Sequence, residues 1–249
     1  MTRVTRSSVD SDLCAYPELP ELWDSVILPV DKPTGISSYD VIRQLKRLLP
    51  DKKLGHAGTL DPLATGLLIC LIGRATKTMR FILEEEKTYE GVMRLGETTA
   101  SYDSETPVLE KRDTSHITAE DIENGRLEFL GTLVQSTPMY SAVRMGGERL
   151  YKKARRGERL KTPMRVVTVS SFNLEEPGGN DISFVLRCSS GTYVRSIVHE
   201  FGQKLGVGAH LTSLRRTRIG AVTIDQAWRL ETLTEQIAGS PGPSGQRNA

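Results

Sequence analysis

The feature that most constrains this chain is a glycine-punctuated segment, Gly55–Gly66, that runs directly into the apolar segment Leu67–Ile72. Its glycines permit backbone conformations or close approaches that a side chain would forbid. Pro62 disfavours a helical backbone for Asp61, so the carboxylate is presented from a constrained loop. The apolar run that follows indicates a buried strand. Such a loop is typical of a functional site, although an Asp-Pro turn with a purely structural purpose has the same local signature.

The length and composition bound the class of protein. A chain of 249 residues can bury a substantial core. No apolar run approaches the roughly 20 residues needed to cross a bilayer, and the first residues lack the apolar centre of a signal peptide. The cysteines (Cys14, Cys70 and Cys188) are far apart, without Cys-x-x-Cys spacing. We therefore expect a cytoplasmic protein with reduced thiols, no membrane segment and no structural zinc site.

The net charge is only +2, so the positions of the charged residues are more informative about binding partners than the net charge. The segment Arg149–Arg165 holds eight basic residues against Glu158 alone, which is +7 locally. A second basic cluster spans Arg215–Arg218. Each cluster alone could be a solvated face. Together with the reactive loop they favour contact with a phosphate backbone.

Composition also predicts the domain organisation. Residues 1–21 lack periodicity and are expected to form a flexible N-terminal arm. Residues 22–238 should form one domain. From residue 239 to residue 249 the chain turns to Gly, Ser and Pro, which predicts a flexible tail.

Periodicity and turn residues predict the order of elements within this domain. Ser37 and Asp40 form a capping-box pattern ahead of a helix, and Thr118 opens another helix in the same way. The remaining expected elements are strands at 25–30, 67–72, 87–95, 131–136 and 140–144, helices at 75–83 and 148–156, a hairpin of 166–174 with 182–188, and a helix after residue 194. The hairpin indicates antiparallel pairing.

Read as a whole, the sequence resembles the TruB family of tRNA pseudouridine synthases. The string Gly-His-Ala-Gly-Thr-Leu-Asp-Pro-Leu-Ala-Thr-Gly resembles the catalytic motif of that family, and Asp31–Ser38 resembles its N-terminal motif. Further similar segments are Met139–Ala142, Ser190–Ile197 and Gly208–Arg216. The resemblance spans about residues 26–228. It implies an α/β (α+β) pseudouridine synthase fold, with a mixed, largely antiparallel sheet, flanking helices and a central cleft.

The resemblance also implies a reaction and a set of site residues. The expected activity is isomerisation of uridine to pseudouridine at position 55 in the T-loop of tRNA, after the base is flipped out of its stack. The implied residues are Asp61 as the essential residue, Arg195 as its partner, Tyr89 stacked on the uracil, Tyr193 and Leu214 in the pocket, and His56 in contact with RNA. Without the resemblance, Tyr89 would be a packing residue of a strand and His56 a structural histidine.

This reaction breaks the bond from N1 to C1′ and joins C5 to C1′, with no net redox change and no added group. We therefore expect no cofactor and no metal. The site needs a carboxylate, a dry pocket and stacking surfaces. Arg195 can keep Asp61 ionised where an isolated carboxylate would take up a proton. The sequence leaves open whether Asp61 attacks the sugar, attacks the base or removes a ribose proton.

The expected partner is the T-arm of tRNA, bound by a monomer. The side chains expected on the RNA backbone are Lys152, Lys153, Arg155, Arg156, Arg215 and Arg216. Many relatives continue into a small C-terminal RNA-binding domain, which this sequence is expected to lack as a short form of the family.

Three other classes fit less well. An aspartyl-phosphate hydrolase usually has a second carboxylate at the position of Leu63. A zinc deaminase needs His-x-Glu and Pro-Cys-x-x-Cys pairs, which are missing. An RNA-binding module without activity would not need Asp61, Tyr89 and Arg195.

Overall fold

The computed structural model describes residues 12–16, 18–175 and 179–239. It divides into two compact units, which are described separately. Unit 1 comprises Met1–Thr88 and Arg215–Ala249, and unit 2 comprises Tyr89–Leu214. The predicted single domain over residues 22–238 stays a prediction, and the predicted tail lies outside the described residues except for Gly239.

Unit 1 contains a mixed sheet in the order β14–β1–β3–β12, with β2 paired to β3 and β13 paired to β12. Strands β1 and β3 are antiparallel along their whole length, whereas β1 with β14 and β3 with β12 are parallel. Its strands are β1 (Ser25–Lys32), β2 (Leu54–Ala57), β3 (Thr65–Gly73), the second half of β12 (Ala209–Ile219), β13 (Val222–Thr223) and β14 (Trp228–Arg229). Its helices are α2 (Ser38–Leu48), the 3₁₀ turn η1 (Arg74–Thr78), α3 (Met79–Glu84), the 3₁₀ turn η2 (Ile224–Gln226) and α7 (Leu230–Gly239).

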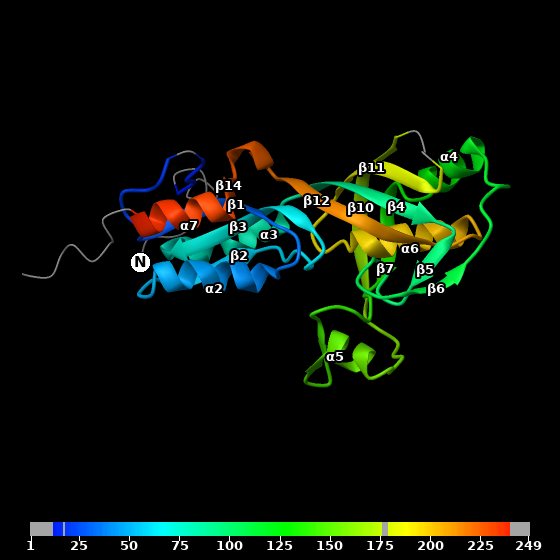
Figure 1. Cartoon of the computed structure of the whole chain (residues 1–249), viewed down its shortest axis with the longest axis horizontal. Helices are drawn as coiled ribbons and strands as arrows, with labels where there is room; N and C mark the ends of the chain where they lie inside the picture. Colours follow the sequence, from blue (N-terminus) through cyan, green and yellow to red (C-terminus); the bar gives the residue numbers. More distant parts are fainter. Residues whose placement is uncertain (1–11, 17, 176–178, 240–249) are drawn as a thin grey trace, which may run out of the picture. The chain divides into compact units, whose positions relative to one another are not determined.

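The core of unit 1 explains this sheet. Residues 66–72 of β3 are all buried, which is why the strand reads as a continuous apolar run. Helices α2, α3 and α7 pack around β1 and β2 (Figure 1). The predicted capping box of α2 is confirmed, since Ser37 and Asp40 bond to each other's backbone N–H groups. Val41, Ile42 and Leu45 then form its buried face.

Part of the predicted N-terminal arm lies within the described residues. Ile27 donates to the carbonyl of Asp12 at 2.7 Å, and Cys14 donates to the carbonyl of Ile27 at 2.8 Å. The ring of Tyr16 meets Trp228 edge to face, with ring centres 5.1 Å apart. These contacts attach residues 12–16 to β1 and to the start of β14.

Unit 2 is built on a second run of strands, in the order β12–β4–β11–β10–β7. Strand β10 is antiparallel to β11, as the hairpin pattern predicts, and also to β7. The strands are β4 (Lys87–Leu95), β5 (Glu97–Thr99), β6 (Val108–Lys111), β7 (Gly131–Ser136), β8 (Arg144–Met145), β9 (Glu148–Arg149), β10 (Met164–Leu174), β11 (Asp181–Cys188) and the first half of β12. The helices are α4 (Ala119–Leu127), α5 (Leu150–Arg155) and α6 (Val194–Lys204).

Helix α6 supplies the core of unit 2. Phe201 packs edge to face against Phe129 and Phe172, with ring centres 5.9 Å apart in both pairs. Gly202 allows the helix to approach β12, because a Cβ at this residue would lie 2.1 Å from the backbone N of Ala209. The predicted mixed, largely antiparallel sheet with flanking helices is confirmed in these strand orders. The central cleft stays a prediction.

Three predicted elements differ from the structure. The strand at 140–144 is wrong, since only Arg144 and Met145 form β8. The carbonyls of Ser141 and Val143 accept hydrogen bonds from the first residues of α5 instead of from a neighbouring strand. The basic helix is shorter than 148–156, because Gly146 and Gly147, both at positive φ, turn β8 into β9 first.

The helix predicted at 75–83 begins as the 3₁₀ turn η1 and becomes α-helical only at Met79. Thr76 and Thr78 each donate a hydroxyl hydrogen bond to the carbonyl three residues before them, at 2.8 Å. Such local bonds compete with regular helical bonding.

Candidate active site

In unit 1 the Asp61 loop, defined here as residues 58–64, connects β2 to β3. Asp61 is half-buried, and its carbonyl accepts from the N–H of Ala64 at 3.1 Å. Ser38, buried at the start of α2, accepts from the N–H of Leu60 at 2.8 Å and donates to its carbonyl at 3.0 Å. Both backbone groups of the residue before Asp61 are thereby fixed.

The predicted N-terminal motif, Asp31–Ser38, makes further contacts with this loop. The N–H of Gly35 donates to the carbonyl of Pro62 at 2.9 Å, and Thr34 donates to the carbonyl of Leu63 at 3.1 Å. The buried ammonium of Lys32 lies 3.4 Å from the same Pro62 carbonyl. The motif therefore serves as a backbone cradle for the loop, a preorganised support of the kind that a reactive group requires.

Arg216 supports the other end of the Asp61 loop. Its guanidinium donates to the carbonyl of Gly58 at 2.8 Å and to that of Leu67 at 2.7 Å, and the side chain is only 1 % exposed. Gly66, with φ +98°, allows the close approach, since a Cβ there would lie 2.3 Å from the Arg216 carbonyl. This geometry gives Arg216 a role inside unit 1 that differs from the predicted phosphate contact.

Arg215 is also engaged within unit 1. It makes a two-pronged ion pair with Asp31, at 3.0 and 2.7 Å. Its side chain remains 39 % exposed, so the guanidinium can still be reached from solvent.

His56 lies in β2 rather than in the loop itself. Burial, and secondarily the charge of Arg216, holds the pKa of His56 below its ordinary value. Its Nδ1 is buried and has no hydrogen-bond partner among the described residues. The imidazole is therefore neutral near pH 7, which favours stacking or hydrogen bonding over attraction to phosphate.

In unit 2, Tyr193 is the N-cap of α6 and Arg195 lies in the first turn of that helix. Arg195 is 3 % exposed and donates to the carbonyls of Ser101 and Tyr140, at 3.0 and 2.5 Å. Its guanidinium carbon lies 5.7 Å from the centre of the Tyr193 ring. These bonds fix the arginine to two loops of its own unit.

The sequence analysis did not identify two features around Tyr193 and Arg195. Gln135, buried in β7, accepts from the N–H of Tyr193 at 2.8 Å and donates to its carbonyl at 3.1 Å. The hydroxyl of Ser101 bonds to the carboxylate of Asp103 at 2.5 Å, which stiffens the loop whose carbonyl Arg195 binds. The sequence signal for that loop is its content of Thr, Ser and Asp from Thr98 to Asp103, which is typical of a turn.

Tyr89 and Leu214 lie on strands of unit 2. Tyr89 is 8 % exposed in β4, and Leu214 is half-buried in β12. Tyr89, Tyr193, Arg195 and Leu214 thus belong to unit 2, whereas His56 and Asp61 belong to unit 1. The predicted pairing of Asp61 with Arg195 would join the two units and stays a prediction.

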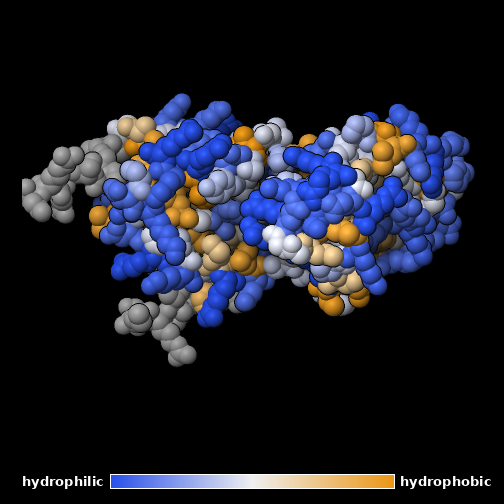
Figure 2. Space-filling model, turned by 90° about the horizontal axis from the view of Figure 1, so that it is seen from below, coloured by the Kyte–Doolittle hydropathy of each residue, from blue (hydrophilic) through white to orange (hydrophobic). Residues whose placement is uncertain are grey.

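The basic segment around α5 projects from the sheet of unit 2 (Figure 1). Lys152 and Arg155 are exposed. Arg156 forms a two-pronged ion pair with Glu148, at 2.7 Å for both contacts, and also bonds to Glu158 at 2.6 Å. Glu148 lies just outside the window that gave +7, so the local charge is +6 when it is included. Figure 2 looks from the side of α5 and shows a largely hydrophilic surface.

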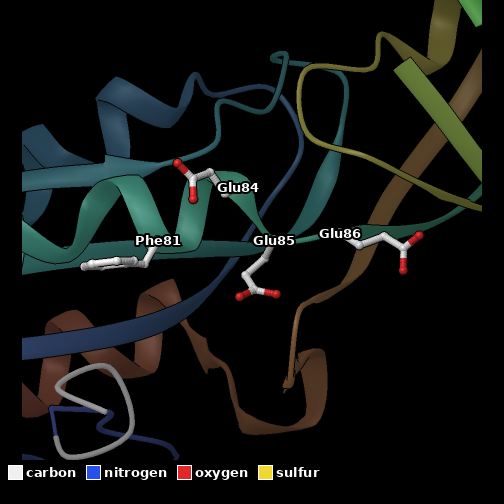
Figure 3. Close-up of a pocket in the computed structure, with 4 residues that line it drawn as sticks. All are labelled: Phe81, Glu84, Glu85 and Glu86. Atoms are coloured by element: carbon white, nitrogen blue, oxygen red, sulfur yellow. The ribbon is translucent and has the colours of Figure 1, made fainter. Parts of the chain in front are cut away.

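A small pocket in unit 1 is lined by Phe81, Glu84, Glu85 and Glu86. Its three carboxylates point in different directions (Figure 3), so they do not converge on one ion. In the part of the chain that the structure describes, no group of three or more His, Cys, Asp or Glu residues is arranged to hold a metal. None of the described helices is long and apolar enough to span a bilayer.

Family models assign the class of protein. Residues 46–194 match the model described as TruB family pseudouridylate synthase (N terminal domain). Residues 195–240 match the model described as tRNA pseudouridylate synthase B C-terminal domain, which falls on the elements from α6 to α7. The fold and these matches define a pseudouridine synthase, an enzyme that isomerises uridine in RNA.

Curated relatives narrow the class to a family. Proteins named tRNA pseudouridine synthase B from Thermobifida fusca and Opitutus terrae are 41 % and 44 % identical to this chain. The matches cover 88 % and 84 % of the chain and 77 % and 87 % of the respective relative. The chain belongs to the TruB family of tRNA pseudouridine synthases.

Solved structures agree with this assignment. A chain of a Cbf5-Nop10-Gar1 complex matches with a TM-score of 0.67 and 29 % identity, and covers 86 % of this chain. A chain of an H/ACA RNP bound to a substrate RNA containing 2′-deoxyuridine matches with a TM-score of 0.63 and 28 % identity, again over 86 % of this chain. This chain spans about half the length of the solved chains, 54 % and 53 % respectively.

Proposed function

We propose that this enzyme converts the uridine at position 55 in the T-loop of tRNA to pseudouridine, with Asp61 as the essential residue. The observation that carries the proposal is the backbone support of the Asp61 loop by Ser38, Gly35 and Arg216. A loop held at nearly every residue around one carboxylate fixes that carboxylate for chemistry. The relatives' name, tRNA pseudouridine synthase B, supports the tRNA substrate.

Within this proposal Arg195 pairs with Asp61 and keeps it ionised in a site from which water is excluded. Tyr89, Tyr193 and Leu214 form the pocket that holds the detached uracil. The base must leave its stack, at a cost of about a few kcal/mol. His56 contacts the RNA and helps hold the flipped state, which suits its lowered pKa. Attack by Asp61 on the sugar, attack on the base and removal of a ribose proton are all compatible with this arrangement.

The RNA backbone is bound by the basic segment around α5, through Lys152, Lys153, Arg155 and Arg156, and by Arg215. The bound shape is a folded T-arm, because folded RNA is recognised mainly through shape and phosphate contacts. Arg216, by contrast, supports the Asp61 loop from inside unit 1.

Tritium release tests the proposal directly. A T-arm stem-loop that carries uridine tritiated at C5 only at position 55 should lose tritium, because C5 gives up its hydrogen when it joins C1′. A matched stem-loop with cytidine at position 55 and tritiated uridines elsewhere should retain its label. Equal release from both RNAs, or release from neither, would contradict the assignment.

A further inference from the structure

Gln135 and Arg165 face each other across two neighbouring strands of unit 2. The register of β7 with β10 places them directly opposite one another. Residues in this relation lie close enough to act on a common neighbour. That neighbour is Tyr193, which both side chains contact.

Gln135 binds the backbone of Tyr193 rather than its ring. Its amide oxygen accepts from the Tyr193 N–H at 2.8 Å, and its amide nitrogen donates to the Tyr193 carbonyl at 3.1 Å. Tyr193 is the N-cap of α6 and has no side-chain cap of its own. A primary amide is the side-chain group that offers an acceptor and a donor side by side, so Gln135, at 1 % exposure, binds both backbone groups of the residue that begins the helix.

Arg165 acts on the ring and on the loop before it. Its guanidinium carbon lies 4.9 Å from the centre of the Tyr193 ring, within the range of a cation–π contact. It donates to the carbonyl of Gly191 at 2.9 Å and to the hydroxyl of Thr137 at 3.3 Å. Its Nε is buried and makes no hydrogen bond within the described part of the chain. The guanidinium is therefore directed toward Tyr193 and the carbonyl of Gly191.

We propose that Gln135 and Arg165 are positioning residues that together set the orientation of Tyr193, with Gln135 fixing its backbone and Arg165 its ring. The inference rests on the proposed function, in which Tyr193 lines the uracil pocket. Arg165 falls in the basic segment that the sequence assigns to RNA, so the competing role is a phosphate contact. The two roles differ in what they require: orientation needs the planar fork, whereas a phosphate contact needs only charge.

A double-mutant cycle under single-turnover conditions separates the two roles. Arg165→Met should slow pseudouridine formation about five- to tenfold, which corresponds to one cation–π contact. The same loss should appear in a Tyr193→Phe background, which keeps the ring, and should shrink to less than about twofold in a Tyr193→Leu background. Arg165→Lys keeps a charge that can lie over the ring but lacks the planar fork that also reaches Gly191 and Thr137, so it should recover only part of the lost rate. An equal loss in the Leu background, or full rescue by lysine, would overturn the proposal.

The effect of Gln135 and Arg165 on Tyr193 can also be tested without measuring enzyme activity. In protein labelled with 3-fluorotyrosine, the Tyr193 resonance is assigned by its disappearance in Tyr193→Phe. Both Gln135→Met and Arg165→Lys should shift that resonance, whereas Lys161→Met, at an exposed basic residue four positions before Arg165, should not. Unmoved resonances in both variants would refute the inference even if the wild-type enzyme made no pseudouridine. Absence of wild-type turnover would count against the proposed function instead.

Discussion

Ser38 and Leu60 exchange two hydrogen bonds, although 22 residues separate them in the sequence. One hydroxyl thereby satisfies both the N–H and the carbonyl of the residue that precedes Asp61. Because both groups are buried, neither can turn to water if the hydroxyl is removed. The position of Asp61 is thus tied to the first turn of α2.

Ser38→Ala should reduce both stability and rate. Leaving the backbone groups of Leu60 unsatisfied should cost about 1–3 kcal/mol of unfolding free energy. Loss of the support next to Asp61 should also slow the single-turnover rate. Urea unfolding and tritium release measure the two effects. Ser37→Ala is the matched control, since it removes the cap of α2, worth about 1 kcal/mol, and should spare the rate. A fully active Ser38→Ala enzyme would show that the loop keeps its geometry without this bond.

Asp61→Asn should abolish isomerisation while RNA affinity stays within about tenfold of wild type. The amide keeps the shape of the side chain and loses only the reactive carboxylate. Tritium release and filter binding with the same stem-loop give both quantities. Turnover by pure Asp61→Asn protein would exclude Asp61 as the essential group.

Arg195→Met should lower the rate far more than the affinity, because the arginine is proposed to keep Asp61 ionised. It should also reduce stability, since the carbonyls of Ser101 and Tyr140 lose a charged donor. Arg195→Lys restores the charge without the two-pronged geometry and should recover only part of the rate. Equal losses of rate and affinity in Arg195→Met would identify a phosphate anchor instead.

Stability should fall as the pH drops below about 6.5, because burial lowers the pKa of both His56 and His199 from the ordinary value of 6.5. Below that pH, the two histidines bind more protons in the unfolded chain than in the folded chain. The stabilisation is complete above pH 6.5 and is lost as the pH falls toward the lowered folded values. His56→Gln should therefore narrow the difference in unfolding free energy between about pH 7.5 and about pH 5.5. An unchanged difference in His56→Gln would show that His56 does not carry this pH dependence.

Local patterns predicted much of the fold because each had its own physical cause. The capping boxes at Ser37 and Thr118 form as expected, and β4 and β7 keep their predicted bounds. The strand predicted at 140–144 was wrong because the carbonyls of this segment bond to the first residues of α5 and not to a neighbouring strand. The periodicity of a sequence does not show such hydrogen-bond partners.

In the candidate active site, too, the sequence did not show the hydrogen-bond partners of buried polar side chains. Charge clustering predicts that Arg216 contacts RNA, which stays a prediction, and no sequence pattern shows that Arg216 binds backbone carbonyls inside the fold. Gln135 carried no signal at all, since a polar residue in an alternating strand usually faces solvent.

The last prediction concerns which basic side chains bind RNA. Lys152 and Arg155 are exposed and form no ion pair with described residues, whereas Arg156 must give up its bonds to Glu148 and Glu158 before it can bind a phosphate. Each phosphate contact releases counterions, so its loss should flatten the salt dependence of binding by roughly one unit. Lys152→Ala with Arg155→Ala should therefore flatten the slope by about two units, and Arg156→Ala by less than about one. Both variants should raise KM and leave kcat nearly unchanged. If the double variant keeps the wild-type salt dependence and KM, the segment around α5 is a solvent-exposed surface that does not bind RNA.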